Sequence, residues 1–322
     1  MKQNNYLLNF LKVTFFALLL IATSPVRAEI KVVTTIKPLH SLIANVMDGV
    51  GEPSLIIEDS TSPHSFTLKP SHAKLLEEAD LIFWVGEGIE TFMERPLESI
   101  VKNAEVVEFM EVESIEKLKF REESIYGDHD DHDGHDDHDD HDDHDDHAGH
   151  EGHNHGEFDA HIWLDPMNAK EMVHEIAHEL GHLDPTNKDK YEANADATIL
   201  ALDQLIEDVS KDINKDAKFV VFHDAYQYFE ERFGVRAAGA LTLNTDVLPG
   251  AKQIDEIQDV IKDRGINCIF SEPQFNPKII TTIAKDTNIK TGVFDPLGAN
   301  INSDKDLYFK LISNLGSELK GC

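Results

Sequence analysis

Positive charge is scarce in this sequence. Its 322 residues include 29 lysines and arginines against 61 aspartates and glutamates, which leaves a formal net charge of −32. Nucleic acids and anionic membranes carry charge of the same sign, so this composition argues against both as partners. It suits a soluble protein that handles cations.

Long apolar runs are also absent. The longest covers residues 13–22, which is shorter than the roughly 20 residues that a transmembrane helix needs. Lys2 and Lys12 precede this run, and small residues follow within positions 24–28. We therefore predict a cleaved secretory signal peptide over residues 1–28, with the mature protein starting at Glu29. An uncleaved N-terminal anchor is the alternative.

Cysteine is nearly absent, since the chain has only Cys268 and Cys322. Exported proteins fold in an oxidising compartment, where two cysteines most simply form one intramolecular disulfide. Such a bond would tie the C-terminal residue to a predicted strand. Two unrelated thiols, or an intermolecular bond at the terminal cysteine, are the alternatives.

What the mature chain does contain is a regular alternation of short β-branched runs and amphipathic helical patterns. This alternation is typical of βαβ units and parallel sheets. The predicted strands are 30–35, 54–58, 81–85, 105–109, 218–222, 237–241, 268–270 and 291–294. The predicted helices are 38–47, 70–78, 89–102, 168–183, 185–213, 226–232, 250–263 and 277–285.

These elements predict an α/β fold of two lobes, each a mostly parallel sheet flanked by helices, with one long rigid helix joining them. The N-terminal lobe is expected over residues 29–184, the connecting helix over 185–213 and the C-terminal lobe over 214–322. Asp184 and Pro185 would begin the connecting helix as its N-cap and its first helical residue.

Residues 127–157 are the most unusual stretch, because histidine recurs at every third position and aspartate fills most of the gaps. Without large apolar residues the stretch cannot bury enough surface to offset the entropy of ordering, so we expect a disordered loop. Imidazoles beside carboxylates are ligands for zinc and similar metals, which predicts metal binding. A solvated acidic spacer is the alternative. The predicted accessory ligands are His129, His132, His135, His138, His141, His144, His147, His150, His153 and His155.

Residues 174–178 match the HExxH pattern of zinc metalloproteases, in which both histidines bind zinc and the glutamate is the general base. The apolar positions of this predicted helix form one stripe, which leaves His174, His178 and His182 on the opposite, charged face. The longer protease motif also needs a later methionine turn, but the last methionine is Met172. We therefore interpret these histidines as exposed residues that bind metal at most adventitiously.

Three other histidines share a different placement. His64 follows the second predicted strand, and His161 precedes a predicted helix. His223 directly follows an apolar strand, and Asp295 directly follows the last predicted strand. In open parallel sheets, ligands bind just outside the carboxyl ends of the strands. Each residue alone is more often an ordinary turn or core residue. Together, two from each lobe, they predict a tetrahedral zinc site in the cleft between the lobes.

Several motifs resemble one family in their order along the chain. They are PHSF at 63–66, PS at 70–71, HIWLDP at 161–166, HDAYQYF at 223–229, SEPQ at 271–274 and DPLG at 295–298. They resemble the metal-binding motifs of cluster A-I substrate-binding proteins of ABC transporters. Within that group the chain is most similar to the high-affinity zinc-uptake receptors of Gram-negative bacteria, over essentially the whole mature chain.

The resemblance implies a periplasmic receptor, not an enzyme, that captures Zn²⁺ as its transported ligand. Its partners would be a cognate ABC permease and the cytoplasmic ATPase of that permease. The three histidine ligands of the family map onto His64, His161 and His223, and its disulfide maps onto Cys268 with Cys322. Manganese-binding relatives carry a glutamate in place of the third histidine, and a third imidazole favours zinc.

The fourth ligand is less clearly indicated. Some zinc receptors carry a glutamate just before the first histidine, where this chain has Pro63. The position then falls to Asp295, to a water or to a loop histidine, of which we predict Asp295. Glu272 is expected at the cleft, supporting a ligand. Because all ligand imidazoles must be neutral, binding should weaken below about pH 6.5.

Three other functions fit parts of the pattern. They are a manganese or iron receptor of the same fold, a secreted HExxH metalloprotease, and a metal buffer in which the His/Asp loop is the whole function. The protein is expected to be a monomer without a nucleic-acid partner. The long connecting helix predicts limited lobe closure, with metal released by loosening of a ligand loop.

Overall fold

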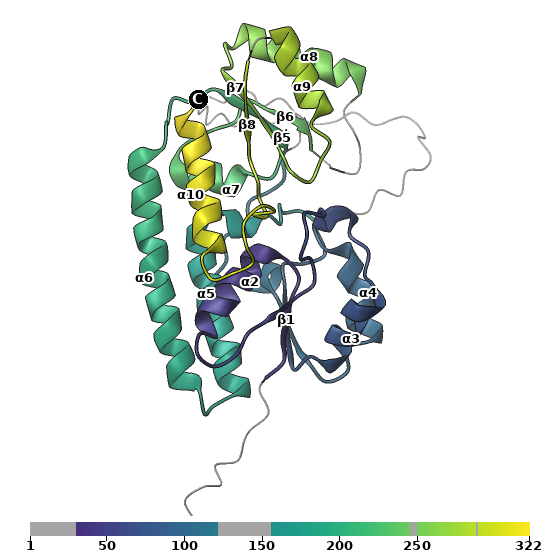
Figure 1. Ribbon diagram of the computed structural model, residues 1–322, viewed down its shortest axis with the longest axis vertical. Helices are drawn as coiled ribbons and strands as arrows, with labels where there is room; N and C mark the ends of the chain where they lie inside the picture. The colour runs from purple at the N-terminus through teal and green to yellow at the C-terminus, as the bar shows by residue number, and fades with distance from the viewer. Residues whose placement is uncertain (1–29, 122–155, 244, 246–249, 288) are drawn as a thin grey trace, which may run out of the picture.

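The computed structural model describes residues 30–121, 156–243, 245, 250–287 and 289–322. The predicted signal peptide and nearly all of the predicted His/Asp loop lie outside these residues. Two four-stranded sheets lie one above the other in Figure 1, and every strand pair in them is parallel. The strands are β1 (Val32–Thr34), β2 (Ser54–Leu55), β3 (Leu81–Trp84), β4 (Glu105–Glu108), β5 (Phe219–His223), β6 (Ala240–Thr242), β7 (Cys268–Ser271) and β8 (Lys290–Val293).

Helices flank both sheets. The α-helices of the described chain are α2 (Lys37–Val46), α3 (Pro70–Glu78), α4 (Thr91–Ser99), α5 (Pro166–Leu183), α6 (Lys188–Asp212), α7 (Gln227–Phe233), α8 (Ala251–Asp263), α9 (Lys278–Thr287) and α10 (Leu307–Lys320). Short 3₁₀ helices are η1 (Pro63–Ser65), η2 (Phe109–Glu111) and η3 (Ile162–Leu164). In Figure 1, α3 and α4 lie on one side of the N-terminal sheet and α2 with α5 on the other. Among the described residues, no helix combines the length and the apolar character needed to cross a membrane.

The two sheets have the same topology, β2-β1-β3-β4 and β6-β5-β7-β8. In each sheet the second strand lies on one side of the first strand and the third strand lies on the other. The loops that leave the carboxyl ends of the first and third strands therefore diverge. Ligands bind at this switch point in open parallel sheets. The inner strands are mostly apolar because helices cover both of their faces, and β3 and β5 are buried along their whole length.

The predicted two-lobe α/β fold is confirmed, with two differences in its helices. α6 begins at Lys188, preceded by Asn187, and not at Pro185 as predicted. The Asp184 carboxylate instead accepts a hydrogen bond from the Asn187 amide at 2.6 Å, which stabilises the turn between α5 and α6. The second difference is α10, which is absent from the predicted elements.

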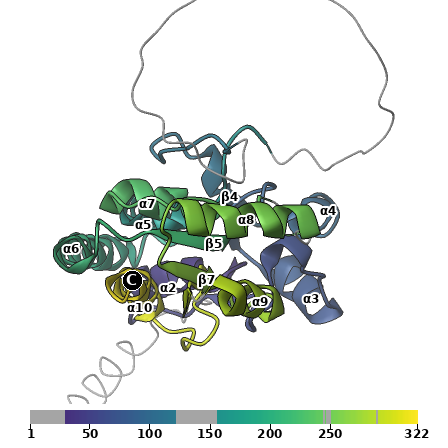
Figure 2. The same cartoon turned by 90° about the horizontal axis from the view of Figure 1, so that it is seen from above.

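Both α6 and α10 connect the lobes. α6 runs along both sheets at the edge of the molecule, and Figure 2 shows α10 beside it. α10 follows the last strand of the C-terminal sheet but packs against α2 of the N-terminal lobe. Before it, the chain contacts that lobe again, where the Lys37 ammonium donates to the Ala299 carbonyl and Ser41 donates to the Lys305 carbonyl. The largest hydrophobic core cluster accordingly contains residues of both lobes.

The Cys268–Cys322 disulfide is present, which confirms the predicted pairing. It joins the first residue of β7 to Cys322, two residues after the end of α10. The bond therefore fixes the C-terminus of the helix that spans the two lobes.

Candidate metal centre

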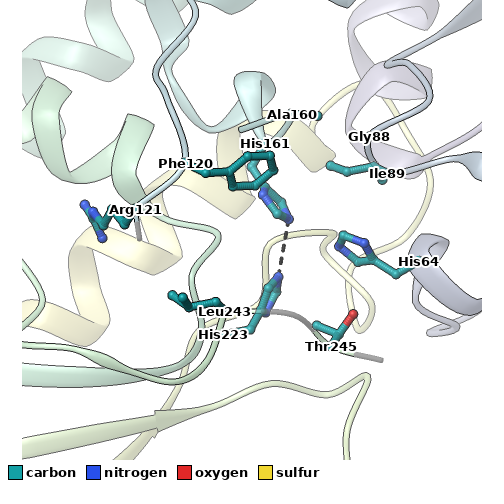
Figure 3. Close-up of a pocket in the computed structure, with 10 residues that line it drawn as sticks. All are labelled: His64, Gly88, Ile89, Phe120, Arg121, Ala160, His161, His223, Leu243 and Thr245. Carbon is teal, nitrogen blue, oxygen red and sulfur yellow. Dashed lines mark hydrogen bonds between the residues drawn. The ribbon is translucent and has the colours of Figure 1, made fainter. Parts of the chain in front are cut away.

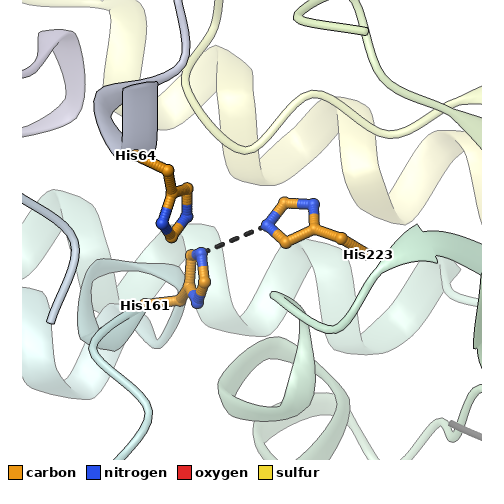
Figure 4. A group of neighbouring side chains, drawn as sticks. All are labelled: His64, His161 and His223. Atoms are coloured by element: carbon orange, nitrogen blue, oxygen red, sulfur yellow. Dashed lines mark hydrogen bonds between the residues drawn. The ribbon is translucent and has the colours of Figure 1, made fainter. Parts of the chain in front are cut away.

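The structure brings His64, His161 and His223 together, and Figure 4 shows their rings facing one another. One ring nitrogen of each lies within 4.8 Å of those of the other two, and the ring centroids are 5.2 to 5.8 Å apart. His64 belongs to η1 after β2, His161 immediately precedes η3, and His223 is the last residue of β5. The three imidazoles therefore come from both lobes and meet at the carboxyl ends of the sheets.

Two buried carboxylates hold two of these rings. The Asp159 carboxylate lies 2.6 Å from Nδ1 of His161, and Glu272 lies 2.6 Å from Nδ1 of His223. All four side chains are buried. A carboxylate at this distance accepts a hydrogen bond from Nδ1–H, so each Nε2 turns its lone pair toward the centre of the group. Asp159 also accepts from the Gln227 amide of α7, which fixes it from the C-terminal lobe.

The two Nε2 atoms of His161 and His223 lie 3.3 Å apart (Figure 4). Because both Nδ1–H groups point at carboxylates, the two Nε2 lone pairs face each other across this gap. Zinc–nitrogen bonds of 2.0–2.1 Å in a tetrahedral shell place two ligand nitrogens roughly 3.3–3.4 Å apart. The gap therefore has the spacing of two nitrogen ligands of one zinc ion.

The charge around His223 also favours a cation. Burial alone would lower the pKa of His223, but the charge and the hydrogen bond of Glu272 raise it above the usual 6.5. The same negative charge attracts a divalent metal. Protons should accordingly compete with the metal from a pH somewhat above 6.5, higher than the ordinary pKa of histidine predicts.

Asp295 is not brought into the group. Its Oδ1 accepts hydrogen bonds from the Gln274 amide and the Leu297 N–H, and its Oδ2 accepts from the Ala299 N–H at 2.6 Å. A carboxylate at the start of a turn satisfies the free N–H groups of that turn, and here both oxygens have that role. The arrangement does not support the predicted role of Asp295 as fourth ligand.

A cavity of about 180 Å³ opens beside the three imidazoles (Figure 3). Gly88 and Ile89 line it from the N-terminal lobe, Leu243 and Thr245 from the C-terminal lobe, and Phe120 from the chain before the His/Asp stretch. A space of this size next to polar nitrogens holds water molecules. A water ligand therefore has room at the position that Asp295 was predicted to fill.

The chain segments that flank the predicted His/Asp loop come together next to this site. Lys119 and Phe158 form an antiparallel bridge. The Tyr228 hydroxyl of α7 donates to the Asp159 carbonyl and accepts from the Leu118 N–H. The base of the loop is thus held against the C-terminal lobe, with His161 only three residues beyond the bridge.

An ion-pair network reinforces this contact between the lobes. Arg121 lies 2.9 Å from Asp224 and 2.7 Å from Glu230, and both carboxylates are buried. Burial raises the pKa of Glu230, while the Arg121 guanidinium acts in the opposite direction. Removing one partner of a buried network leaves uncompensated charge, so Arg121 fixes the loop base firmly.

The HExxH stretch lies elsewhere, on α5. His174, His178 and His182 are exposed, whereas Met172 and Ile176 on the opposite face are buried, as the apolar stripe predicts. None of the three histidines joins the cleft group within the described part of the chain.

Comparison with known proteins identifies the family. The family model described as "Zinc-uptake complex component A periplasmic" matches residues 32–322. The chain belongs to this zinc-uptake component A family. It is 48% identical over 303 residues to the high-affinity zinc uptake system protein ZnuA of Brucella abortus, covering 90% of this chain and 91% of that one. The ZnuA protein of Yersinia pestis is 35% identical over 317 residues, covering 97% and 98%.

Solved structures share the fold. A crystal structure of ZnuA superposes with a TM-score of 0.72 at 21% identity, covering 91% of this chain and 98% of that one. The laminin-binding protein Lmb of Streptococcus agalactiae, described as an adhesin with metal-transporting activity, gives 0.68 at 26% identity over 90% and 99%. The zinc-uptake component A family is a transporter component and not an enzyme, so the metalloprotease alternative is not supported.

Replacing Glu272 should weaken metal binding although Glu272 is not itself a ligand. In Glu272→Ala, Nδ1 of His223 loses the carboxylate that fixes its tautomer, and such losses raise the metal Kd roughly ten- to hundredfold. Glu272→Gln, which keeps an acceptor but loses the charge, should have a smaller effect. Competition with a chromophoric chelator measures both. An unchanged Kd in Glu272→Ala would show that Glu272 does not orient His223.

Proposed function

We propose that the protein is a periplasmic receptor that binds one Zn²⁺ between His64, His161 and His223 and delivers it to an ABC permease. The observation that carries this proposal is the 3.3 Å gap between two Nε2 atoms whose Nδ1 partners are buried carboxylates. Zn²⁺ occupies this gap, with the two Nε2 atoms as ligands. A water from the adjacent cavity completes a tetrahedral shell.

The donor set supports zinc over the manganese or iron alternative. Three imidazoles form a nitrogen-rich shell, whereas manganese prefers carboxylate and water oxygens. The nearby carboxylates lie behind the rings, where Asp159 and Glu272 each contact Nδ1 and not the centre of the group. They contribute negative charge without supplying an oxygen ligand. The names of the ZnuA relatives agree with this choice.

Export and delivery complete the proposal. Residues 1–28 act as a cleaved signal peptide, and the receptor works as a monomer with a permease driven by a cytoplasmic ATPase. The contacts of α10 and residues 299–305 with the N-terminal lobe oppose a wide hinge motion. His64 is less buried than its two partners and lies on a short surface turn. Loosening of this turn is therefore the proposed route of metal release.

Deletion of residues 127–157 tests whether the cleft or the loop is the site. The shortened protein should keep one tight Zn²⁺ equivalent and lose weaker ones, because the three cleft histidines lie outside the deletion. Calorimetric titration of both forms, with Mn²⁺ as competitor, measures stoichiometry and selectivity. If tight binding disappears with the loop, the metal-buffer alternative is correct. If Mn²⁺ displaces Zn²⁺ at equal concentration, the assignment of zinc fails.

A further inference from the structure

We propose that the outer face of α5 carries a second Zn²⁺ site, formed by Glu179 and His182 together with Glu105 at the start of β4. The ligand atoms of these three side chains lie within 4.8 Å of one another. This second site is separate from the cleft, and the proposal does not depend on the function proposed for the cleft. It would take a divalent cation of borderline softness, with water completing the shell.

The sequence of α5 repeats one metal-binding pattern. Glu-x-x-His occurs three times at four-residue spacing, beginning at Glu171, Glu175 and Glu179. Residues three apart on a helix are neighbours on its surface, so each glutamate lies beside its histidine. Helical Glu-x-x-His pairs supply metal ligands in carboxylate-bridged metal proteins. Outside residues 127–157 the chain has eight histidines, and α5 holds as many of them as the cleft does.

Among the described residues, the last repeat is the one that forms a metal-ligand group with a residue of another element. Nδ1 of His182 lies 3.7 Å from the Glu105 carboxylate, which β4 holds in place. Glu179 contributes to a second three-ligand group as well, with Glu175 and His178, and lies 2.8 Å from Nδ1 of His178. Glu179 is therefore the common ligand of two overlapping groups, and its side chain is only 19% exposed. Both features fix its position on the helix.

Charge and space favour a metal over a simple His–carboxylate ion pair. The group has two carboxylates for one imidazole, so even a protonated His182 leaves one negative charge, whereas Zn²⁺ neutralises both. His174, His178 and His182 also border a hollow of about 470 Å³ between α5 and α6. Of the three proposed ligands only His182 borders this hollow, and its exposed ring leaves room for water on an ion bound to it.

The proposed site should be weaker than the cleft and distant from it. Its ligands are two oxygens and one nitrogen on an exposed surface, which bind zinc less tightly than three buried imidazoles. His182 lies near the C-terminal end of α5, while His161 precedes the helix. The helix between them places the two sites roughly 24 Å apart along its axis.

Protection of His182 from diethyl pyrocarbonate tests the proposal in the full chain. The reagent acylates a free imidazole nitrogen, and fragmentation mass spectrometry assigns the product to a single histidine. Free Zn²⁺ is set by a metal buffer, so that binding elsewhere does not change it. At ten times the half-saturating Zn²⁺ concentration, modification of His182 should slow about tenfold, because only the unbound ring reacts. His174, on the same face without a third ligand, should change less.

Two variants decide the outcome. Glu179→Gln keeps the size of the side chain but removes a carboxylate ligand, so the protection of His182 should be lost while the melting temperature stays unchanged. His223→Ala disables the cleft, and protection of His182 should persist there. Zn²⁺ would therefore still protect His182 if the cleft proposal failed. Equal modification of His182 with and without Zn²⁺, or protection that survives in Glu179→Gln, would overturn the second site.

Discussion

Replacing His223 with alanine is expected to raise the Kd for Zn²⁺ at the cleft about a hundredfold or more. Zinc sites with four protein ligands gain roughly 10–16 kcal/mol on binding, or about 3 kcal/mol for each ligand, which corresponds to about two decades in Kd. His223 also supplies one side of the 3.3 Å gap, so its loss removes the preformed pair. Competition with a chromophoric chelator at pH 7.5 measures the change.

Two further variants separate a lost ligand from a damaged fold. His223→Ala leaves Glu272 buried without its partner and could destabilise the C-terminal lobe. His64→Ala, on the half-buried turn, should lower affinity by a similar factor with less effect on stability. His174→Ala on the exposed face of α5 is the matched control and should leave the cleft Kd unchanged. A His64→Ala protein that binds as tightly as the parent would exclude His64 as a ligand.

Replacing both cysteines with serine should lower the free energy of unfolding by about 4 kcal/mol. The bond closes a loop of 54 residues, and the chain-entropy relation gives this value for a loop of that length. For a chain of this size the melting temperature should fall by roughly 6 °C. Urea unfolding of the metal-free protein measures the difference.

Reduction of the parent protein supplies the comparison. Dithiothreitol should lower the unfolding midpoint of the parent to that of the double variant and leave the variant itself unchanged. The tight zinc site of the folded variant should remain, because Cys268 and Cys322 are not among the cleft residues. Equal unfolding midpoints for the oxidised parent and the variant would contradict the prediction, and would mean that α10 stays docked without the disulfide.

Much of the fold could be predicted because the local pattern and the final environment agree. The apolar runs of β3 and β5 predict strands buried on both faces, and both strands are buried along their length. The placement of His64, His161 and His223 at strand ends and before a helix follows from the same pattern. Parallel topology then brings the three together.

The contact of Glu272 with His223 agrees with the predicted place of Glu272 at the cleft, whereas the support from Asp159 could not be predicted, because it depends on contacts between distant segments. Asp295 follows a predicted strand and Asp159 follows the predicted His/Asp loop, and no local pattern shows which of the two contacts the metal site. The Asp295 carboxylate accepts hydrogen bonds from backbone N–H groups of its own turn. The Asp159 carboxylate instead contacts Nδ1 of His161 and accepts a hydrogen bond from Gln227 of the other lobe. The spacing of the leucines in α10 is helical, but nothing local indicates that this helix packs against α2.

The contact between α10 and α2 has a consequence for the order of folding. It joins the first helix of the described chain to the last one. Contacts at such sequence separation form late, since closing a long loop opposes them entropically. Because a chain is made from its N-terminus, α10 is made last. Until it is available, the surface of α2 that α10 covers in the finished protein stays uncovered. The two lobes should complete their folding together, after an exported chain has crossed the membrane.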